Sequence, residues 1–148
     1  MQTRGRLKKI LVVKEAEKNF AKNEYDHALN EFEQEGQELY ELLKKKEHLE
    51  GSLRSSLQHG ISVDYIKQQQ YFVNNLEKSL LVQQRKVSHA RAFMNVKAEK
   101  LKEHSIECKK YERLDEKEQK LFQQIETKLE SKFIDELSIL QYSHQTYR

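Results

Sequence analysis

Between two long apolar repeats the sequence reads Gln58-His59-Gly60-Ile61-Ser62, followed by Val63 and Asp64. Gly60 has no Cβ and can adopt the left-handed conformation in which many helices end. Ser62 can cap a following helix through its hydroxyl, and Asp64 would place negative charge in the first turn of that helix. This stretch therefore predicts a tight turn between two helices.

The residues before the turn repeat with the spacing of a coiled coil. Steps of four and three residues from Ala21 pass through eleven positions, of which eight are apolar. The positions are Ala21, Tyr25, Ala28, Phe32, Glu35, Leu39, Leu42, Lys46, Leu49, Leu53 and Ser56. So narrow a stripe is typical of a coiled-coil seam rather than of a globular helix. Further upstream the phase shifts, and Leu7, Ile10, Leu11, Val13 and Phe20 indicate a local stutter near residues 14–18.

The residues after the turn carry a second seam. Its apolar members are Ile66, Val73, Leu76, Leu80, Val87, Ala90, Met94, Leu101, Cys108, Tyr111, Phe122, Ile125, Leu129 and Ile139. Polar residues interrupt it at Gln69, Gln83, Lys97, His104, Asp115, Glu118, Lys132 and Glu136. The architecture predicted from both repeats is two long helices joined by the turn.

The distribution of charge predicts that these helices pair within one chain. Residues 23–43 contain seven acidic side chains and no Lys or Arg. A parallel dimer would place this strip beside its own copy, which like charges oppose. Folding back at Gly60 instead places it opposite residues 79–96, which contain Arg85, Lys86 and Arg91 and no acid.

We therefore expect an all-α protein, an antiparallel two-helix coiled-coil hairpin whose C-terminal helix is longer and overhangs. Residues 1–148 would form a single domain, with helix one at about 6–58, the turn at 59–62 and helix two at about 62–145. Leu7 would lie opposite roughly Arg113, leaving residues 114–148 without an intramolecular partner over on the order of 50 Å. That overhang remains apolar at Leu114, Leu121, Phe122, Ile125, Leu129, Phe133, Ile134, Leu137, Ile139, Leu140 and Tyr142. Such a stripe predicts a partner protein, or else a frayed end.

The composition excludes several classes of protein. Only 36% of the residues are hydrophobic and 34% are charged, which disfavours a compact core, while the absence of proline disfavours disorder. The longest apolar run, residues 10–13, is too short to span a bilayer, and the basic start lacks the features of a secretory signal. A single cysteine fits a reducing cytoplasm, and a net charge of +3 does not by itself indicate nucleic-acid binding.

No group of residues in the sequence resembles a catalytic centre, so we expect no enzyme, no cofactor and no metal. His104 and Cys108 lie four residues apart, a spacing that can chelate a metal, but two ligands do not complete a zinc site. Both fall on the second seam, which favours a structural role. The basic residues at the start of the chain, Arg4, Arg6, Lys8, Lys9 and Lys14, indicate a solvated helix end or a docking surface for an acidic protein.

Aromatic residues just after the turn indicate a second surface. Tyr65, Tyr71 and Phe72 project off the seam, and exposed aromatic side chains on a helix that has already buried its apolar stripe are typical of binding sites. The alternative is that Tyr71 and Phe72 widen the core near the turn.

The same stretch resembles the FliJ family, small components of the bacterial flagellar type III export apparatus. The resemblance is carried by Gly60-Ile61-Ser62 and by Gln69, Gln70, Phe72, Val73, Leu76, Glu77 and Lys78. It implies an antiparallel coiled coil similar to the gamma-subunit stalk of rotary ATP synthases. It also implies three partners: the hexamer of the export ATPase FliI, the cytoplasmic region of the export gate FlhA, and export chaperones. The protein would be cytoplasmic, monomeric when free, and held at the membrane face of the flagellar base only through these proteins.

The resemblance also implies two binding surfaces. The surface facing the export gate would comprise Glu38, Leu42, Lys45, Leu49, Phe72, Leu76, Ser79 and Gln83. Leu49 replaces a usual aromatic residue there, and Lys45 and Ser79 depart further from the family pattern. The surface inserted into the ATPase ring would comprise Leu7, Ile10, Leu11, Val13, Leu121, Phe122, Ile125, Leu129 and Phe133. A rival interpretation is a structural coiled coil that self-associates through its C-terminal overhang and has no motor partner.

Overall fold

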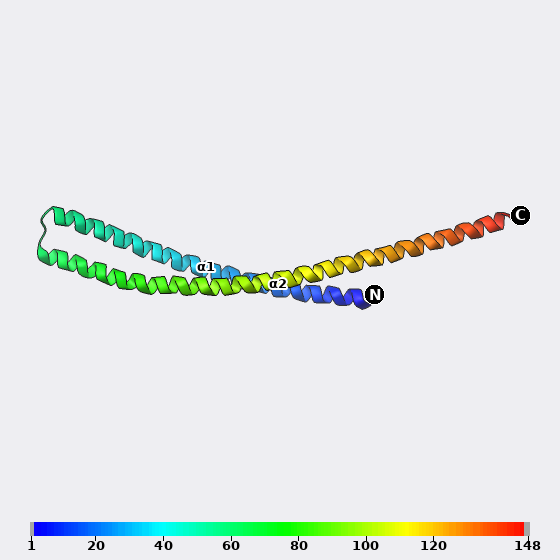
Figure 1. The fold of residues 1–148 in the computed structure, drawn as a ribbon, viewed down its shortest axis with the longest axis horizontal. Helices are drawn as coiled ribbons and strands as arrows, with labels where there is room; N and C mark the ends of the chain where they lie inside the picture. Colours follow the sequence, from blue (N-terminus) through cyan, green and yellow to red (C-terminus); the bar gives the residue numbers. More distant parts are fainter. Residues whose placement is uncertain (1, 147–148) are drawn as a thin grey trace. The chain divides into compact units, whose positions relative to one another are not determined.

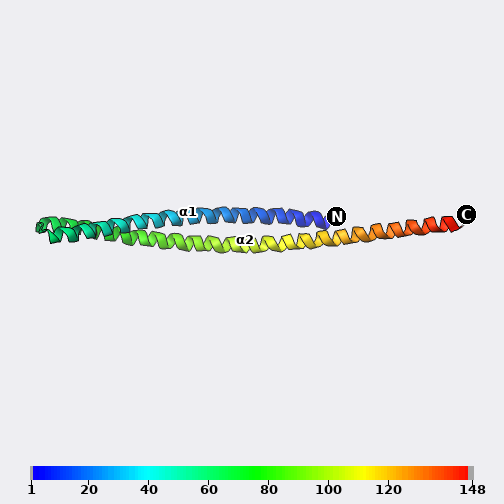
Figure 2. The same ribbon diagram turned by 90° about the horizontal axis from the view of Figure 1, so that it is seen from above.

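The computed structural model describes residues 2–146, which form two helices, α1 (Gln2–Gln58) and α2 (Val63–Thr146), and no strand (Figure 1). This confirms the all-α helical hairpin with the longer C-terminal helix. Packing divides the chain into two units. We call residues 19–102 the turn unit, and residues 2–18 together with 103–146 the end unit. In the turn unit the two helices lie side by side in both views (Figures 1 and 2).

The connection between the helices has the predicted chemistry. Gly60 has a φ of 70°, in the left-handed region that a residue with a Cβ resists, and no other described residue has a positive φ. The backbone N–H of Tyr65 donates to Ser62 Oγ at 3.4 Å, so Ser62 caps α2. Asp64 lies in the first turn of α2. The stop signal and the start signal are therefore both confirmed.

The seam of the turn unit is the one that the heptads predict. All eleven positions from Ala21 to Ser56 are buried or half-buried, and so are the seam positions of α2 from Ile66 to Leu101. Several of the buried side chains are small or β-branched, such as Ala28 and Val73. Small side chains let the two helices approach closely, and the apolar area removed from water stabilises the pair.

Polar contacts between the helices of the turn unit fix their register. Lys97 Nζ lies 2.8 Å from Glu24 Oε2, and this hydrogen bond lowers the pKa of Glu24. Gln83 Nε2 donates to the backbone carbonyl of Glu35 at 2.9 Å and also to the carboxylate of Glu35. The guanidinium of Arg91 lies over the ring of Phe32, 5.5 Å from its centroid, in the middle of the acidic strip.

In the end unit the heptad phase continues without interruption, so the predicted stutter is wrong. Lys14 lies seven residues before Ala21, and Leu7 lies seven residues before Lys14. Both are half-buried, whereas Val13 is 55% exposed. Phe20, in the turn unit, is likewise 66% exposed. The apolar count was misleading because lysine can occupy a seam position by burying its aliphatic stem while its ammonium group reaches a carboxylate.

The paired part of the end unit is longer than predicted. Leu7 and Ile10 share a groove with Lys117, Glu118 and Leu121, whereas the expectation placed Leu7 opposite roughly Arg113. Asp115 is only 9% exposed, and Phe122 is still half-buried. Every described side chain from residue 123 to residue 145 is exposed. The overhang of α2 therefore begins after Phe122. The register itself is close to the predicted one, because Lys14 pairs with Glu107 and Glu24 with Lys97. The paired part is longer because α1 already begins at Gln2.

None of the helices in the described part of the chain has a stretch long and apolar enough to cross a membrane.

Candidate functional site

An open groove of about 1300 Å³ lies between α1 and α2 in the turn unit. We call it the turn groove. From α1 it is lined by Glu41, Lys44, Lys45, Glu47, His48, Leu49, Gly51 and Ser52, and from α2 by Phe72, Asn75, Leu76 and Ser79. The half-buried seam residues Leu49 and Leu76 supply its apolar part, and charged side chains of α1 surround them. An apolar groove with a charged rim is suited to binding a protein segment.

The turn groove brings together five of the eight residues expected to face the export gate. They are Lys45, Leu49, Phe72, Leu76 and Ser79. The other three do not line it. Leu42 is half-buried in the seam, Glu38 is exposed on α1, and Gln83 is buried and bonded to Glu35.

The aromatic residues after the turn belong to the surface and not to the core. Tyr71 is 64% exposed and Phe72 is 48% exposed. Their rings form an edge-to-face pair with centroids 6.2 Å apart. Phe72 lines the turn groove, whereas Tyr71 is not among the residues that line it. The alternative in which both rings widen the core is therefore wrong.

The sequence prediction missed several residues of the turn groove. Lys44, His48, Gly51 and Asn75 line it, although no family resemblance pointed to them. The heptads held a signal for one further missed residue, because Ser52, like the predicted Lys45, Phe72 and Ser79, directly precedes a seam residue. In an antiparallel pair the positions that precede the seam on both helices lie on the same flank.

The end unit exposes most of the residues expected to enter an ATPase ring. Val13, Leu121, Ile125, Leu129 and Phe133 are exposed. Leu7, Ile10, Leu11 and Phe122 are half-buried, and Leu7 and Ile10 line a groove of about 540 Å³ with Leu121. The seam members of this set therefore hold the helix pair together, while the exposed members are accessible to a partner.

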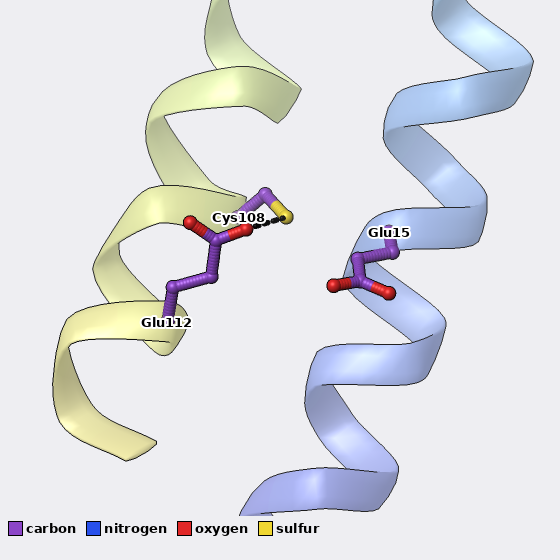
Figure 3. Close-up of side chains that lie close together, drawn as sticks. All are labelled: Glu15, Cys108 and Glu112. Carbon is purple, nitrogen blue, oxygen red and sulfur yellow. Dashed lines mark hydrogen bonds between the residues drawn. The ribbon is translucent and has the colours of Figure 1, made fainter. Parts of the chain in front are cut away.

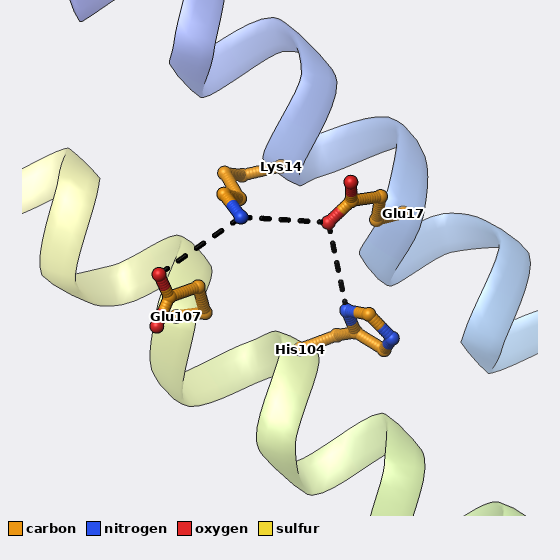
Figure 4. A network of polar contacts seen from close by, with 4 residues as sticks. All are labelled: Lys14, Glu17, His104 and Glu107. Atoms are coloured by element: carbon orange, nitrogen blue, oxygen red, sulfur yellow. Dashed lines mark ion pairs between the residues drawn. The ribbon is translucent and has the colours of Figure 1, made fainter.

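Charged residues replace apolar ones in the seam of the end unit (Figure 4). Lys14 Nζ lies 3.7 Å from Glu17 Oε2 and 3.9 Å from Glu107 Oε1. His104 Nδ1 lies 3.7 Å from Glu17 Oε2. Two carboxylate oxygens nearby, one on Asp115 and one on Glu118, are buried without a hydrogen-bond partner. Partly exposed ion pairs contribute little stability, and unpartnered buried oxygens reduce it.

Cys108 lies between two carboxylates (Figure 3). Its Sγ is 3.8 Å from Glu112 Oε1, and Glu15 approaches from α1; ligand atoms of the three side chains lie within 4.8 Å of one another. Cys108 is 1% exposed, and burial, reinforced by the charge of Glu112, raises the pKa of its thiol. A thiol that stays protonated is a poor nucleophile and a poor metal ligand. The geometry therefore favours the structural role expected for Cys108, while His104 pairs with Glu17 instead of with the sulfur.

Comparisons with known proteins agree with the family resemblance of the sequence. The family model described as "Flagellar FliJ protein" matches residues 2–146. The "Flagellar FliJ protein" of Bacillus subtilis (strain 168) is 39% identical over 140 residues, which cover 95% of both chains. No solved structure matches the chain.

Proposed function

This chain belongs to the FliJ family of flagellar proteins, and we propose that it serves flagellar protein export as a non-enzymatic stalk and escort protein. In this role the end unit binds the hexameric ring of the export ATPase FliI and promotes assembly of the ring. The turn groove contacts the cytoplasmic region of the export gate FlhA. The protein also binds export chaperones, and it reaches the membrane face at the flagellar base through its protein partners.

The turn groove is the observation that best supports the contact with the gate. Five residues that the family resemblance assigns to this contact, drawn from two helices, line one groove. Phe72 is the best single anchor among them, because its ring is half exposed and lies outside the seam. A partly exposed aromatic ring beside apolar side chains is a common centre of binding energy in protein interfaces.

The overhang supports the contact with the ATPase ring. Leu121, Ile125, Leu129 and Phe133 are exposed, and most of them lie beyond the last paired residue of the end unit. An apolar helix surface that its own chain leaves uncovered can be buried by a partner. A ligand that binds the assembled ring more tightly than the separate subunits shifts the equilibrium toward the ring.

The decisive experiment is a titration of ATP hydrolysis by the cognate export ATPase with this protein. We expect hydrolysis to rise and to saturate near one chain per hexamer, with light scattering showing more hexamer at the same ATPase concentration. Absence of stimulation, together with a stable dimer of the protein alone, would instead favour a coiled coil that only self-associates.

The gate contact is tested separately by calorimetric titration with the cytoplasmic region of FlhA. We expect Phe72→Ala to weaken binding by about tenfold or more, as truncation of an interface anchor does. Tyr71→Ala is the matched control, because Tyr71 is an exposed neighbour that does not line the turn groove. Equal affinities of Phe72→Ala and the unsubstituted protein would remove the turn groove from the gate contact.

A further inference from the structure

The outward side of α2 in the end unit carries a stripe of basic residues that the proposed function does not use. A shallow groove of about 530 Å³ is lined by Ile106, Lys109, Lys110, Arg113, Leu114 and Lys117. We call these six residues the basic stripe. Their spacing of three and four places them along one side of the helix. All six are exposed, including the aliphatic side chains of Ile106 and Leu114.

Charge is sorted around this part of α2. Residues 106–117 contain four basic and four acidic residues, so the segment as a whole is balanced. Three of the acidic residues lie on the side of α1. Glu107 pairs with Lys14 at 3.9 Å, Glu112 accepts a hydrogen bond from Cys108, and Asp115 is buried (Figures 3 and 4). The four basic residues all lie on the opposite, exposed side.

The basic stripe opposes the stability of its own helix. Within the described chain, none of its four basic side chains is within ion-pair distance of a carboxylate. Arg113 lies four residues from both Lys109 and Lys117, a spacing at which like charges repel. An ordinary solvated helix side mixes both signs of charge. The exposed Glu116, three residues after Arg113, offsets only part of this repulsion. Four basic groups around two exposed aliphatic side chains therefore indicate a surface that a partner completes.

We propose that the basic stripe docks an acidic, amphipathic helical segment of a partner protein. Carboxylates spaced by three and four residues on that segment match the four basic groups, and one or two aliphatic side chains cover Ile106 and Leu114. Nucleic acid fits less well, because the stripe has no aromatic ring for base stacking and phosphates offer no apolar contact. A membrane surface fits less well because only two aliphatic side chains are available to insert.

Arg113→Glu gives a sharp test, because it changes binding and stability in opposite directions. A glutamate at position 113 would sit four residues from Lys109 and from Lys117 and turn two repulsions into attractions, against one new repulsion from Glu116. We expect the urea midpoint of the full chain to rise slightly. We also expect affinity for an acidic partner to fall about tenfold. Arg85→Glu, at an exposed base of the turn unit, is the matched control and should leave that affinity unchanged.

The probe is a synthetic helical peptide of about 18 residues with glutamates and two leucines on one side. Its counterpart has lysine in place of each glutamate. Fluorescence anisotropy should show binding of the acidic peptide alone, weakening as salt rises from about 50 to 300 mM. Leu114→Ser should weaken that binding further without changing the salt dependence.

Two results would overturn the proposal. One is equal affinity of Arg113→Glu and the unsubstituted protein for the acidic peptide. The other is tighter binding of a DNA duplex or of phosphatidylglycerol vesicles than of the peptide, with that binding lost in Arg113→Glu. In the second case the stripe would be a nucleic-acid or lipid surface.

Discussion

Gly60 shows how much one residue contributes to this hairpin. At its φ of 70°, an added Cβ would crowd the carbonyl group of the residue's own backbone. No other part of the fold would lie within 4 Å of that Cβ, so the backbone conformation is the only source of strain. Gly36 has the same open surroundings but lies inside α1, where glycine weakens the helix. The same substitution at the two positions should therefore have opposite effects.

We expect Gly60→Ala to lower the free energy of unfolding by about 1 kcal/mol, from backbone strain alone. Gly36→Ala should raise it by about 0.5 to 1 kcal/mol. Urea unfolding followed by circular dichroism measures both. A loss of stability in both variants would mean that the conformation at Gly60 is not the source of the effect.

The pair between Glu24 and Lys97 makes stability depend on pH. The hydrogen bond from Lys97 lowers the pKa of Glu24 in the folded chain. A carboxyl group with a lowered folded pKa binds fewer protons folded than unfolded, so its contribution is present above its unfolded pKa and is lost as pH falls through the folded value. Glu24→Gln should therefore be less stable than the unsubstituted protein at pH 7, and this difference should shrink below about pH 4. A difference that stays constant down to pH 3 would contradict the assignment.

At the scale of the helices, the two units differ in the chemistry of their seams. Apolar side chains such as Phe32, Val73 and Leu80 predominate in the seam of the turn unit, whereas Lys14, His104 and Asp115 occupy seam positions of the end unit. Buried carboxylate oxygens without partners reduce stability further. We therefore expect the end unit to open locally more often than the turn unit.

Cys108 is a built-in reporter of that opening, because it is the single cysteine and is buried. Labelling by Ellman's reagent should be limited by separation of α1 from α2 in the end unit. Asp115→Leu should slow labelling about tenfold, since an apolar group then replaces a buried carboxylate whose Oδ1 has no hydrogen-bond partner, although Oδ2 accepts from Gln119. Glu116→Leu, at the exposed neighbour, should leave the rate unchanged. Equal rates in all three proteins would show that the thiol reacts without opening of the unit.

The overhang can be removed without touching the seam. A chain ending at Gln123 keeps every half-buried residue, and we expect its urea midpoint to be unchanged while stimulation of the export ATPase is lost. A chain ending at Arg113 also loses Asp115, Glu118 and Phe122, so its end unit should be less stable. Full stimulation by the chain ending at Gln123 would exclude the overhang from the ring contact.

The sequence predicted the helices, the turn and nearly all seam positions, because heptad spacing and caps are local properties of the chain. It did not predict that Lys14 occupies a seam position. A hydrophobicity pattern classifies lysine as polar because of its ammonium group, although its aliphatic stem can be buried. It also missed Lys44, His48 and Asn75 in the turn groove. Which residues line a groove between two helices depends on the register of the helices. Contacts between distant residues, such as that of Gln83 with Glu35, determine this register.

At the scale of the whole molecule, the free protein should be a monomer of 17.8 kDa. Its own two helices fill the seam, and the acidic strip of residues 23–43 disfavours pairing with a second copy. The exposed stripe of the overhang is interrupted by Lys132 and Glu136, which would lie unpaired in a dimer. Light scattering at micromolar concentration measures this mass, and a dimer that disappears when the chain ends at Gln123 would contradict the expectation.

The position of the turn also has a consequence for how the chain folds. Contacts nearest Gly60 close the shortest loops, whereas Lys14 and Glu107 are far apart along the chain and meet only after the intervening pairs have formed. Pairing of the two helices should therefore start beside the turn and proceed toward the termini. Each further pair then costs only a small loss of chain entropy for loop closure. Because the sequence has no proline, no peptide-bond isomerisation delays this process. During synthesis on the ribosome, α1 has no helix to pair with until the first turns of α2 emerge. The N-terminal turns of α1 are made before the rest of the hairpin, yet they pair last.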